Sequence, residues 1–478
     1  MSDVLKKLRN RSRHGRRVTR SRLFASNLKR KLKSQPKQFR AFLLGKQKHS
    51  DGKRYESDKR VSDFRHWCKK VGLELHPNLY IGERDSCHKI GVIATESIMT
   101  GECLAVIPRE AILSCANSTV ASVVERDEEL KEVTSSWVPL LIALAAECSL
   151  KSKSHWHAYL NLVPNNEDCG PPMLWSKADR ARLLEGTCMS QLVESDLKRI
   201  EDDFRNVVLP LMKKNPQIFR AEVQNDEEYK KLVSLVMSYS FTDAEDDRVT
   251  SSTMMVPFVD LLNHSSQHHA ELTFTRKALK LMVVRDIKQG EEVMNTYGEL
   301  SNTSLLHTYG FCEVNNPHDI VLIPTECIHH VYMACVSQED SGAVAHQQKH
   351  WEQIKSDGLL EENYCVDRDG EPDLDLLLLI KLLYSRNNKY KSLVKKHTCG
   401  KLVDFSTQDL IEEELAFLTR LTKYRLSLYP EAYDSLLPLL SEHSVEMTEK
   451  ERYGLYLSIG QQKCLRTLLV ETGSGQGS

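Results

Sequence analysis

The sequence predicts an α+β fold in which short strands, a helical stretch, further strands and a final helical stretch follow one another. Three observations predict it. Turn-bounded apolar runs of strand length occur in two separate parts of the chain, helix-period patterns fill the region between them, and such patterns return after about residue 325. Because strands and helices do not alternate one by one, a parallel sheet of βαβ units is not expected.

The first part of the fold is expected to begin near Val61. The stretch DFRHWCKKVGL (63–73) places its aromatic and small apolar residues on one helical face. Strand-like runs follow at KIGVIATESI (89–98) and ECLAVIPREAILS (102–114), the second of them around a proline.

The next stretch, from about 116 to 240, has the apolar spacing of helices. After the acidic, breaker-rich run TDAEDDRVTSS (242–252), three strand-like runs return, and beyond 325 helical patterns dominate. The expected helices are WVPLLIALAAE (137–147), DLKRIEDDFRNVVLPLM (196–212), EEYKKLVSLVMSYSF (227–241), DLDLLLLIKLLYS (373–385) and TQDLIEEELAFLTRLTKYRLSLY (407–429), and the expected strands are AELTFTR (270–276), ALKLMVVRDI (278–287) and EEVMNTYG (291–298). The chain contains no internal repeat.

Charge is unevenly distributed along the chain. The formal net charge is −1, but residues 1–60 carry 21 lysines and arginines against 4 acidic residues, or +17, so the remaining residues carry −18. The stretch KKLRNRSRHGRRVTRSR (6–22) has almost no apolar residues to bury and is expected to be disordered in isolation. Such a tail is typical of nuclear targeting and of weak, nonspecific contact with RNA or DNA. A solvated tail without a selective partner is the alternative.

Composition excludes several classes of protein. With 41% hydrophobic and 27% charged residues the chain is typical of a globular protein. No stretch approaches the roughly 18 uncharged apolar residues of a membrane span, and the basic start lacks the apolar segment of a secretory signal, so a location inside the cell is expected. The closest of the thirteen cysteines are Cys327 and Cys335. This spacing argues against a cysteine zinc cluster and a disulfide framework, and predicts reduced, mostly buried thiols.

Three short motifs carry the candidate chemistry. DLLNHS (260–265) ends an apolar run with Asn-His, NTYG (295–298) follows a strand-to-turn signature, and HTYGF (307–311) repeats Tyr-Gly twelve residues later. Each motif alone is typical of an ordinary turn. His264 and His268 are four residues apart, as a helical pair of zinc ligands would be. Since no glutamate lies between them and no third ligand is evident, a metal-dependent hydrolase is only an alternative.

Taken in this order, the motifs resemble those of the SET-domain protein-lysine methyltransferases, in the branch like the Rubisco large-subunit methyltransferase. KIGVIATESIMTGECLAVIPRE (89–110) resembles the first hairpin of that fold. MVPFVDLLNHS and EEVMNTYGELSNTSLLHTYGF resemble the two crossing segments of its active site. The resemblance covers about residues 62–470. It implies a SET-domain β fold split by a helical insert that closes the lysine channel, followed by an all-helical substrate-binding domain.

The resemblance divides the chain into five parts. They are a basic tail (1–60), the N-terminal part of the SET fold (61–115), the helical insert (116–245), the C-terminal part of the SET fold (246–320) and a helical substrate-docking domain (321–470). A passive, stabilising role is the alternative for the last of these.

The resemblance also assigns roles to individual residues. Tyr297 corresponds to the active-site tyrosine beside the transferred methyl group. The residues that correspond to the binding site of the methyl donor, S-adenosyl-L-methionine, are Lys89, Ile90, Gly91, Tyr239, Asn263, His264 and Tyr309. Trp137, Ser240 and Thr242 correspond to positions where the insert meets the target peptide. At Thr242 the chain departs from the pattern, in which a longer polar side chain is typical. No metal is implied.

Methyl transfer to a lysine needs the neutral amine. The pKa of lysine is about 10.4, so at pH 7 the neutral form costs roughly 4.6 kcal/mol. Desolvation in an apolar channel lowers this pKa, and aromatic faces stabilise the cationic donor. A phenol oxygen then orients the amine and the methyl group, and alignment supplies much of the remaining rate.

We therefore expect a protein-lysine N-methyltransferase of the nucleus that acts on non-histone proteins and also on histones, and adds one methyl group. Protein substrates are the expected partners, and no membrane contact is expected. The first alternative is a catalytically silent scaffold that binds proteins on the same fold, against which the intact Asn263, His264, Tyr297 and Tyr309 argue. The second is methyl transfer to a small molecule or a nucleic acid. The target protein and lysine do not follow from the sequence.

Overall fold

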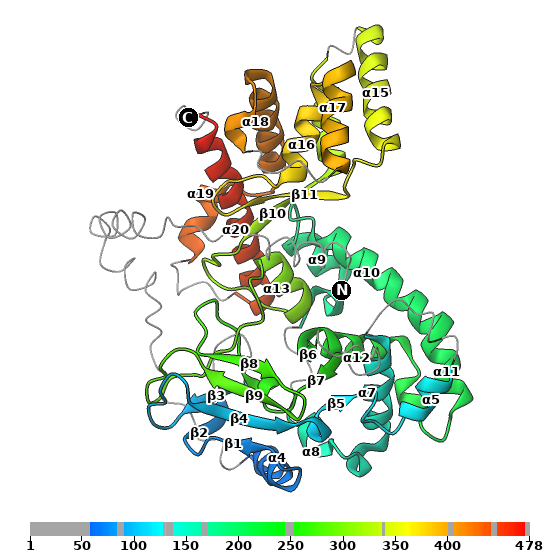
Figure 1. Cartoon of the computed structure of the whole chain (residues 1–478), viewed down its shortest axis with the longest axis vertical. Helices are drawn as coiled ribbons and strands as arrows, with labels where there is room; N and C mark the ends of the chain where they lie inside the picture. Colours follow the sequence, from blue (N-terminus) through cyan, green and yellow to red (C-terminus); the bar gives the residue numbers. More distant parts are fainter. Residues whose placement is uncertain are drawn as a thin grey trace.

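The computed structural model describes residues 58–83, 90–127, 130, 137–163, 170–243, 253–336, 340–399, 406–440 and 447–473. Residues 1–57 of the basic tail and Lys89 lie outside the described residues. In the described part, strands form four antiparallel sheets, with the orders β1-β4-β9-β8, β2-β3, β5-β7-β6 and β10-β11 (Figure 1). The strands are β1 (Glu74–Leu75), β2 (Leu79–Glu83), β3 (Ile90–Ala94), β4 (Cys103–Pro108), β5 (Leu113–Ser114), β6 (Ser240–Thr242), β7 (Thr253–Met255), β8 (Ala270–Phe274), β9 (Ala278–Val283), β10 (Ile320–Pro324) and β11 (Asn363–Asp367).

The helices follow the predicted order. One precedes the first strands, a group lies between β5 and β6, and a third group follows β9 (Figure 1). They are α4 (Lys59–Lys70); α5 (Ala121–Arg126), α7 (Val138–Leu150), α8 (His157–Leu160), α9 (Lys177–Leu183), α10 (Met189–Asp203), α11 (Leu209–Lys214) and α12 (Asp226–Tyr239); and α13 (Asn302–Tyr309), α14 (Thr325–Met333), α15 (Ser341–Ser356), α16 (Leu374–Leu383), α17 (Asn387–Thr398), α18 (Glu412–Ser427), α19 (Tyr433–Leu436) and α20 (Glu449–Glu471). The predicted α+β class is confirmed.

The four-stranded sheet combines strands from before the helical group, β1 and β4, with strands from after it, β8 and β9. Strand β4 pairs with β9, with Ile107 opposite Leu279, although more than 160 residues of chain separate the two strands. Both of these side chains are fully buried. Because β4 and β9 are neighbours in the sheet, the helical group between them must begin and end close to this sheet. The β5-β7-β6 sheet holds the two ends together, since β7 pairs with β5 before the helical group and with β6 after it.

Helix α7 is the centre of the inserted helical group. Its sequence VPLLIALAAECSL is apolar around the whole helix, which is typical of a helix covered on every side, and almost all of it is buried. Two tryptophan hydrogen bonds join the insert to the N-terminal part of the fold: Trp67 Nε1 of α4 donates to the carbonyl of His155 (2.7 Å), and Trp156 Nε1 donates to the carbonyl of Ala111 in the turn between β4 and β5 (2.9 Å). The insert is thereby fixed relative to the first sheet.

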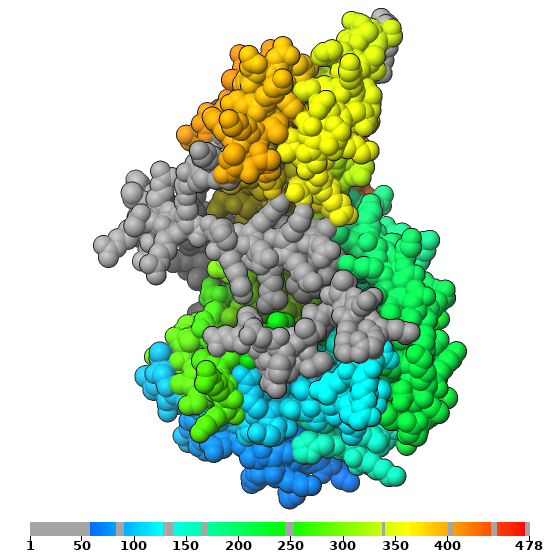
Figure 2. All heavy atoms as spheres, turned by 45° about the vertical axis from the view of Figure 1, so that its right-hand side comes forward, coloured from blue at the N-terminus to red at the C-terminus, as the bar shows by residue number. Residues whose placement is uncertain are grey.

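The third helical group has its own core and projects as a lobe from the body (Figures 1 and 2). Helix α20 connects the two, because Leu457 belongs to the main core whereas Leu465 and Leu468 belong to the lobe. Gly454 and Gly460 let this helix approach closely: a Cβ at Gly454 would lie 2.6 Å from the carbonyl of Leu183, and a Cβ at Gly460 would lie 2.3 Å from Asp319 Oδ2.

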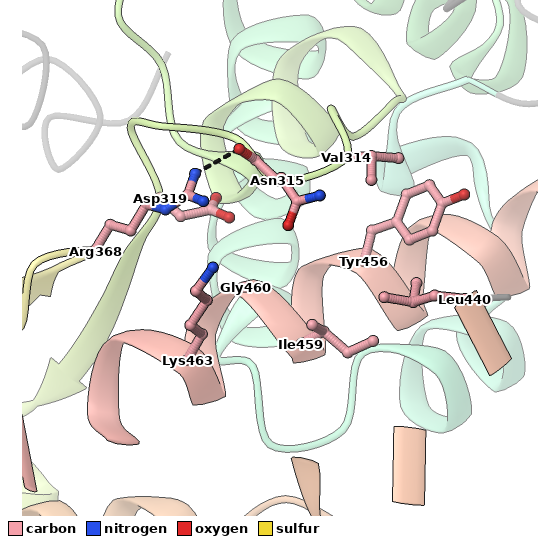
Figure 3. Close-up of a pocket in the computed structure, with 9 residues that line it drawn as sticks. All are labelled: Val314, Asn315, Asp319, Arg368, Leu440, Tyr456, Ile459, Gly460 and Lys463. Carbon is pink, nitrogen blue, oxygen red and sulfur yellow. Dashed lines mark hydrogen bonds between the residues drawn. The ribbon is translucent and has the colours of Figure 1, made fainter. Parts of the chain in front are cut away.

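The packing of α20 buries a carboxyl group. Asp319, Arg368 and Lys463 converge beside Gly460 around a cavity of about 30 Å³ (Figure 3). Burial raises the pKa of Asp319 to about 7, although hydrogen bonds from Asn302 oppose the shift. The junction between the body and the lobe is therefore polar at its centre.

Three details differ from the sequence-based expectations. Residues 291–298 were expected to form a strand, and this is wrong: they make only isolated bridges, from Glu292 to Ile93 and from Asn295 to His264 and Ala270. The predicted helix over 196–212 contains a π-helical turn (Phe204–Val208), since Pro210 has no N–H to continue the α-helical ladder. Beyond 320 the chain is helical as predicted, but it also contains an antiparallel pair of strands, β10 and β11.

Two further findings concern cysteines and membranes. All eleven cysteines that the structure describes are free, and Cys399 is the exposed one among them. Within the described ranges, none of the helices combines the length and the apolar character that crossing a membrane requires.

Candidate active site

Two chain segments that are distant in sequence lie side by side at the centre of the site. The main-chain N–H of Asn295 donates to the carbonyl of Asn263 (2.9 Å), and the N–H of Ser265 donates to the carbonyl of Asn295 (3.1 Å). On its other side the second segment pairs with β3, where Val293 N–H donates to the carbonyl of Val92 (2.7 Å). The predicted crossing segments are thus adjacent, and the first hairpin lies beside them.

Asn263 joins these elements through its side chain. It is 1% exposed, and its Nδ2 donates to the carbonyl of Ile90 (3.1 Å) and to Glu292 Oε1 (2.6 Å). Ile90 begins β3, in which Gly91 pairs with Gly82 of β2. The structure therefore brings Ile90, Gly91 and Asn263 together, whereas Lys89 lies outside the described residues.

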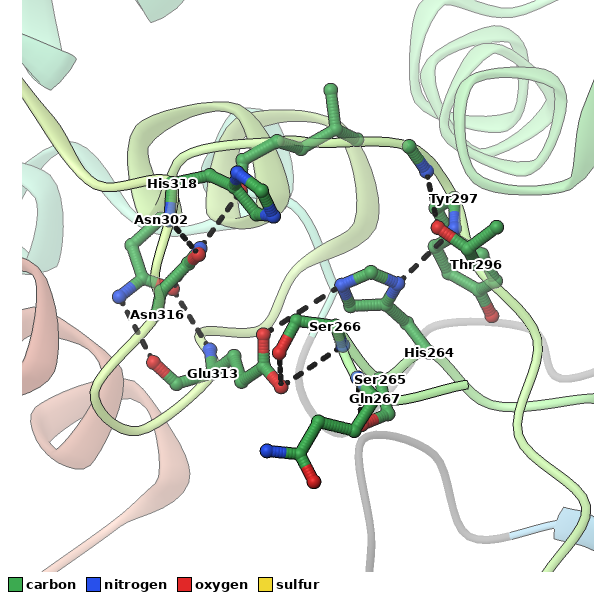
Figure 4. Close-up of polar contacts among 12 residues, drawn as sticks. His264, Ser265, Ser266, Gln267, Thr296, Tyr297, Asn302, Glu313, Asn316 and His318 are labelled. Carbon is green, nitrogen blue, oxygen red and sulfur yellow. Dashed lines mark hydrogen bonds and ion pairs between the residues drawn. The ribbon is translucent and has the colours of Figure 1, made fainter. Parts of the chain in front are cut away.

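His264 is held as a neutral ring. Its Nδ1 accepts a hydrogen bond from the main-chain N–H of Tyr297 (3.1 Å; Figure 4). Burial lowers the pKa of His264 to about 4, and the nearby His268 and His318 add to the shift. Near pH 7 the ring is uncharged, and its role is to fix the main chain of Tyr297.

An aromatic cluster lines this part of the site. The ring of Tyr297 lies 4.6 Å from that of Tyr309, 5.1 Å from that of His264 and 6.1 Å from that of Phe311, measured between centroids. The hydroxyl of Tyr297 donates to the carbonyl of Leu262 (3.0 Å), so the phenol is held from the segment that leads into Asn263. Aromatic faces that converge in this way favour a cation.

Two residues of this arrangement were not among those singled out from the sequence. Phe311 completes the aromatic cluster, and the sequence feature that could have indicated it is its position directly after Tyr309-Gly310. Glu292 accepts from Asn263, but it lay in a run expected to be a strand, in which a carboxylate is an unremarkable solvent-facing residue.

The insert contributes Tyr239 and the strand that follows it. Tyr239 is buried at the end of α12, and the hydroxyl of the adjacent Ser238 donates to the carbonyl of Thr308 (3.0 Å), next to Tyr309. Ser240 is half-buried and Thr242 is exposed on β6. Tyr239 thus lies near the aromatic cluster, and the roles of Ser240 and Thr242 at the peptide stay predictions.

Trp137 lies at the N-terminus of α7, half-buried against the main core. This placement is compatible with packing alone. Its contact with a target peptide stays a prediction.

The histidine pair of the metal alternative is not formed. Residues 263–269 make a bridge and a turn and not a helix, and His268 Nε2 contacts Glu271 Oε1 (2.9 Å). Among the residues that the structure describes, no three histidine, cysteine or acidic side chains gather as metal ligands would.

The two buried histidines, His264 and His269, should lower the free energy of unfolding as the pH decreases from about 6.5 to 4, whereas Asp319, whose pKa is raised to about 7, contributes in the opposite direction over this range. Burial lowers the pKa of both His264 and His269 from 6.5 to about 4. Since the unfolded chain binds these protons first, their contribution is present above about pH 6.5 and is lost as the pH falls through about 4. The contribution of each histidine, roughly 1–3 kcal/mol, should appear as the difference in urea unfolding across this range between the wild type and a variant that lacks that histidine.

A glutamine in place of His269 provides the check. Its amide oxygen can still accept the N–H of Met294, which His269 Nδ1 accepts at 3.2 Å. His269→Gln should reduce the pH dependence by about one proton. An unchanged dependence would contradict the assignment.

Comparison with known proteins shows the family of the chain. Residues 89–298 match the family described as the SET domain. The chain is 31% identical over 454 residues to the Xenopus tropicalis protein named N-lysine methyltransferase setd6, across 90% of this chain and 99% of the relative. It is 39% identical over 303 residues to the protein of the same name from Salmo salar, across 62% of this chain and 67% of the relative.

Solved structures give the same fold. The structure of Rubisco LSMT bound to AdoMet superposes with a TM-score of 0.63 at 16% identity, across 87% of this chain and 92% of that one. The SET domain of LSMT bound to lysine and AdoHcy superposes with a TM-score of 0.64 at 17% identity, with the same coverage. The expected helical insert and C-terminal helical region therefore have counterparts in known structures.

Proposed function

The chain belongs to the SET-domain N-lysine methyltransferases, and from this membership we infer that it transfers a methyl group from S-adenosylmethionine to lysine side chains of proteins. The observation that carries the proposal is the pairing of the Asn263–His264 segment with the Asn295–Tyr297 segment under an aromatic cluster. Relatives matched over nearly their whole length carry the name N-lysine methyltransferase.

The residues present fit the donor. A sulfonium donor needs aromatic faces near its cation, polar groups for its amino-acid and adenine parts, and close main-chain approach. The rings of Tyr297, Tyr309 and Phe311 supply the first, and the Asn263 amide and the main chain around Ile90 supply the others. When bound, the donor supplies an activated methyl group.

The roles of the chain's own residues follow from these contacts. Tyr297 is fixed at both ends, by its main-chain N–H on His264 and its hydroxyl on Leu262, so its phenol oxygen can orient an incoming amine. Because His264 is neutral, it adds no positive charge beside a cationic donor. The surrounding rings desolvate the amine, which lowers its pKa and favours the nucleophilic form.

The substrates and the degree of methylation form a separate part of the proposal. We propose protein substrates of the nucleus, non-histone proteins and histones, and the addition of one methyl group, on the strength of the family resemblance. Docking by the C-terminal lobe is supported by a cavity of about 350 Å³ between the segment after Tyr297, at Glu299 and Ser301, and the turn after β11, at Asp369 and Glu371.

A labelling experiment tests the proposal. The purified full chain is incubated with cell extract and a radioactive or clickable S-adenosylmethionine analogue, and labelled proteins are mapped by mass spectrometry. Label on lysine supports the function, and it should survive EDTA. Donor binding without lysine labelling of any protein would support the catalytically silent scaffold, whereas label on nucleic acid or small molecules would favour the other alternative.

The basic tail gives a separate prediction. Deletion of residues 1–57 removes much of the positive charge of the chain and leaves α4 intact. Turnover on a short peptide should change by less than about twofold, while nuclear accumulation and salt-sensitive binding to RNA or DNA should fall. A melting temperature lowered by more than about 5 °C would contradict the view that the tail is separate from the fold.

A further inference from the structure

Glu313 lies beside the ring of His264 within a continuous set of polar contacts (Figure 4). Its Oε2 is 3.9 Å from His264 Nε2, and this oxygen is buried without a hydrogen-bond partner among the described residues. Its Oε1 accepts from the main-chain N–H (3.1 Å) and the hydroxyl (2.9 Å) of Ser266. The carboxylate is fixed through one oxygen and directs the other toward the histidine.

The main chain of Glu313 is fixed as well. Its N–H donates to Asn302 Oδ1 (2.8 Å), and its carbonyl accepts from Asn302 Nδ2 (3.0 Å). Asn302 donates its own N–H to Asp319 Oδ1 (2.9 Å), at the polar junction with α20. Glu313 is therefore held between the turn after His264 and the start of α13.

The tautomer of His264 follows from its other nitrogen. Nδ1 accepts the N–H of Tyr297, so it carries no proton, and a neutral imidazole then has its proton on Nε2. Nε2 faces Glu313. A carboxylate stabilises an N–H that points toward it, as the aspartate of a catalytic triad stabilises the tautomer of its histidine.

We propose that Glu313 is a positioning residue for methyl transfer, which holds His264 in the tautomer and orientation that fix the main chain of Tyr297. The proposal rests on the proposed function, since the position of Tyr297 affects turnover only if Tyr297 acts on the reacting groups. Glu313 acts through His264 and does not have to touch the donor or the lysine.

A purely structural role makes a different demand on the side chain. To cap the turn at Ser266, only Oε1 is needed, and the amide oxygen of a glutamine could replace it. To hold the tautomer, the negative charge of the second oxygen, 3.9 Å from Nε2, must stabilise Nε2–H, and the amide nitrogen of a glutamine cannot do so because it is a donor without this charge. The two roles therefore separate in Glu313→Gln.

The experiment compares Glu313→Gln with the wild type in the full chain. With its oxygen on Ser266, the glutamine directs an NH₂ group toward Nε2–H, so the proton moves to Nδ1 and the acceptor for Tyr297 N–H is lost. We expect kcat to fall by about tenfold or more, while the Kd for S-adenosylmethionine changes by less than about threefold. The ¹⁵N chemical shifts of the His264 ring, measured by NMR, should show the exchanged tautomer.

Two control variants keep the carboxylate at His264. Ser266→Ala removes one of the two donors to Oε1, and Glu185→Gln removes an exposed negative charge of the helical insert, outside the site. Both should leave kcat within about twofold of the wild type. If either lowered kcat as much as Glu313→Gln does, turn stability or general charge would explain the effect, and the proposal would be overturned.

Other outcomes also decide the question. Wild-type kcat in Glu313→Gln overturns the proposal, and so does a reduced kcat with an unchanged His264 tautomer. If the wild type transferred no methyl group to lysine, the proposed function would fail. The ring ¹⁵N shifts of both proteins would still show whether Glu313 sets the tautomer, so the two failures are distinguishable.

Discussion

Tyr297→Phe should reduce turnover by at least about tenfold, which corresponds to roughly 1.4 kcal/mol in the activation barrier. The substitution removes only a hydroxyl, which donates to the carbonyl of Leu262 at 3.0 Å. The ring contacts with Tyr309, His264 and Phe311 remain, so the free energy of unfolding should fall by only about 1 kcal/mol. Donor binding should change much less than turnover, because the oxygen acts mainly in the transition state.

The measurement pairs a turnover assay on a short peptide with titration of S-adenosylmethionine on the same folded variant. Tyr390→Phe is a matched control, because the hydroxyl of Tyr390 on α17, in the lobe, donates to Asp357 at the end of α15 (2.6 Å) and is removed by the substitution. It should cost similar stability and leave turnover unchanged. Wild-type turnover in Tyr297→Phe would refute the catalytic role, and lost donor binding would reassign Tyr297 to the wall of the donor pocket.

Local patterns were sufficient for most helices. Apolar residues at helical spacing identify α7, α12, α16 and α18, since a helix must bury one face or, for α7, all faces. The strand expected at 291–298 shows the limit of such patterns. Its apolar and polar residues alternate, but its N–H and carbonyl groups bond to two different segments, at β3 and at 263–265, so only isolated bridges form.

The pairing of β10 with β11 was missed for a related reason. Its strands are separated by about 40 residues that include α14 and α15, and pairing at that separation has no local signature. The helices between β5 and β6 were predicted because they are amphipathic or wholly apolar, whereas the pairing of β4 with β9 on either side of them depends on tertiary contacts.

In the candidate site, too, some residues could be predicted from the sequence and others could not. Asn263, His264, Tyr297 and Tyr309, which the structure brings together, were assigned by the resemblance of their motifs to those of the SET-domain methyltransferases, since each motif alone is typical of an ordinary turn. The partners that hold them were not visible. Glu292 and Glu313 are charged residues in polar surroundings, and only folding shows that one accepts from the Asn263 amide and the other faces the His264 ring.

Asn263→Ala should weaken the binding of S-adenosylmethionine by roughly 1–3 kcal/mol, or about five- to 150-fold in Kd. The amide joins the first hairpin to the crossing segments through Ile90 and Glu292, so its loss removes a fixed point of the proposed donor pocket. It also removes the donor from which the carbonyl of Ile90, in a partly buried hydrogen bond, accepts. The free energy of unfolding should therefore fall as well, by roughly 1–3 kcal/mol.

Asn263→Asp separates the amide donor from the shape of the side chain. The aspartate has nearly the same volume, but it has no N–H for Ile90 and places a second carboxylate against Glu292, whose Oε1 lies 2.6 Å from Nδ2 in the native contact. Like charges at this distance repel strongly, so at pH 7 the variant should be less stable than Asn263→Ala. Addition of Glu292→Gln should restore part of the stability, because the repulsion is then removed. Calorimetry on the folded variants measures donor affinity and differential scanning calorimetry measures stability. Unchanged affinity in Asn263→Ala would remove this residue from the donor site, and equal stability of the two variants would show that the amide does not act as the donor between Ile90 and Glu292.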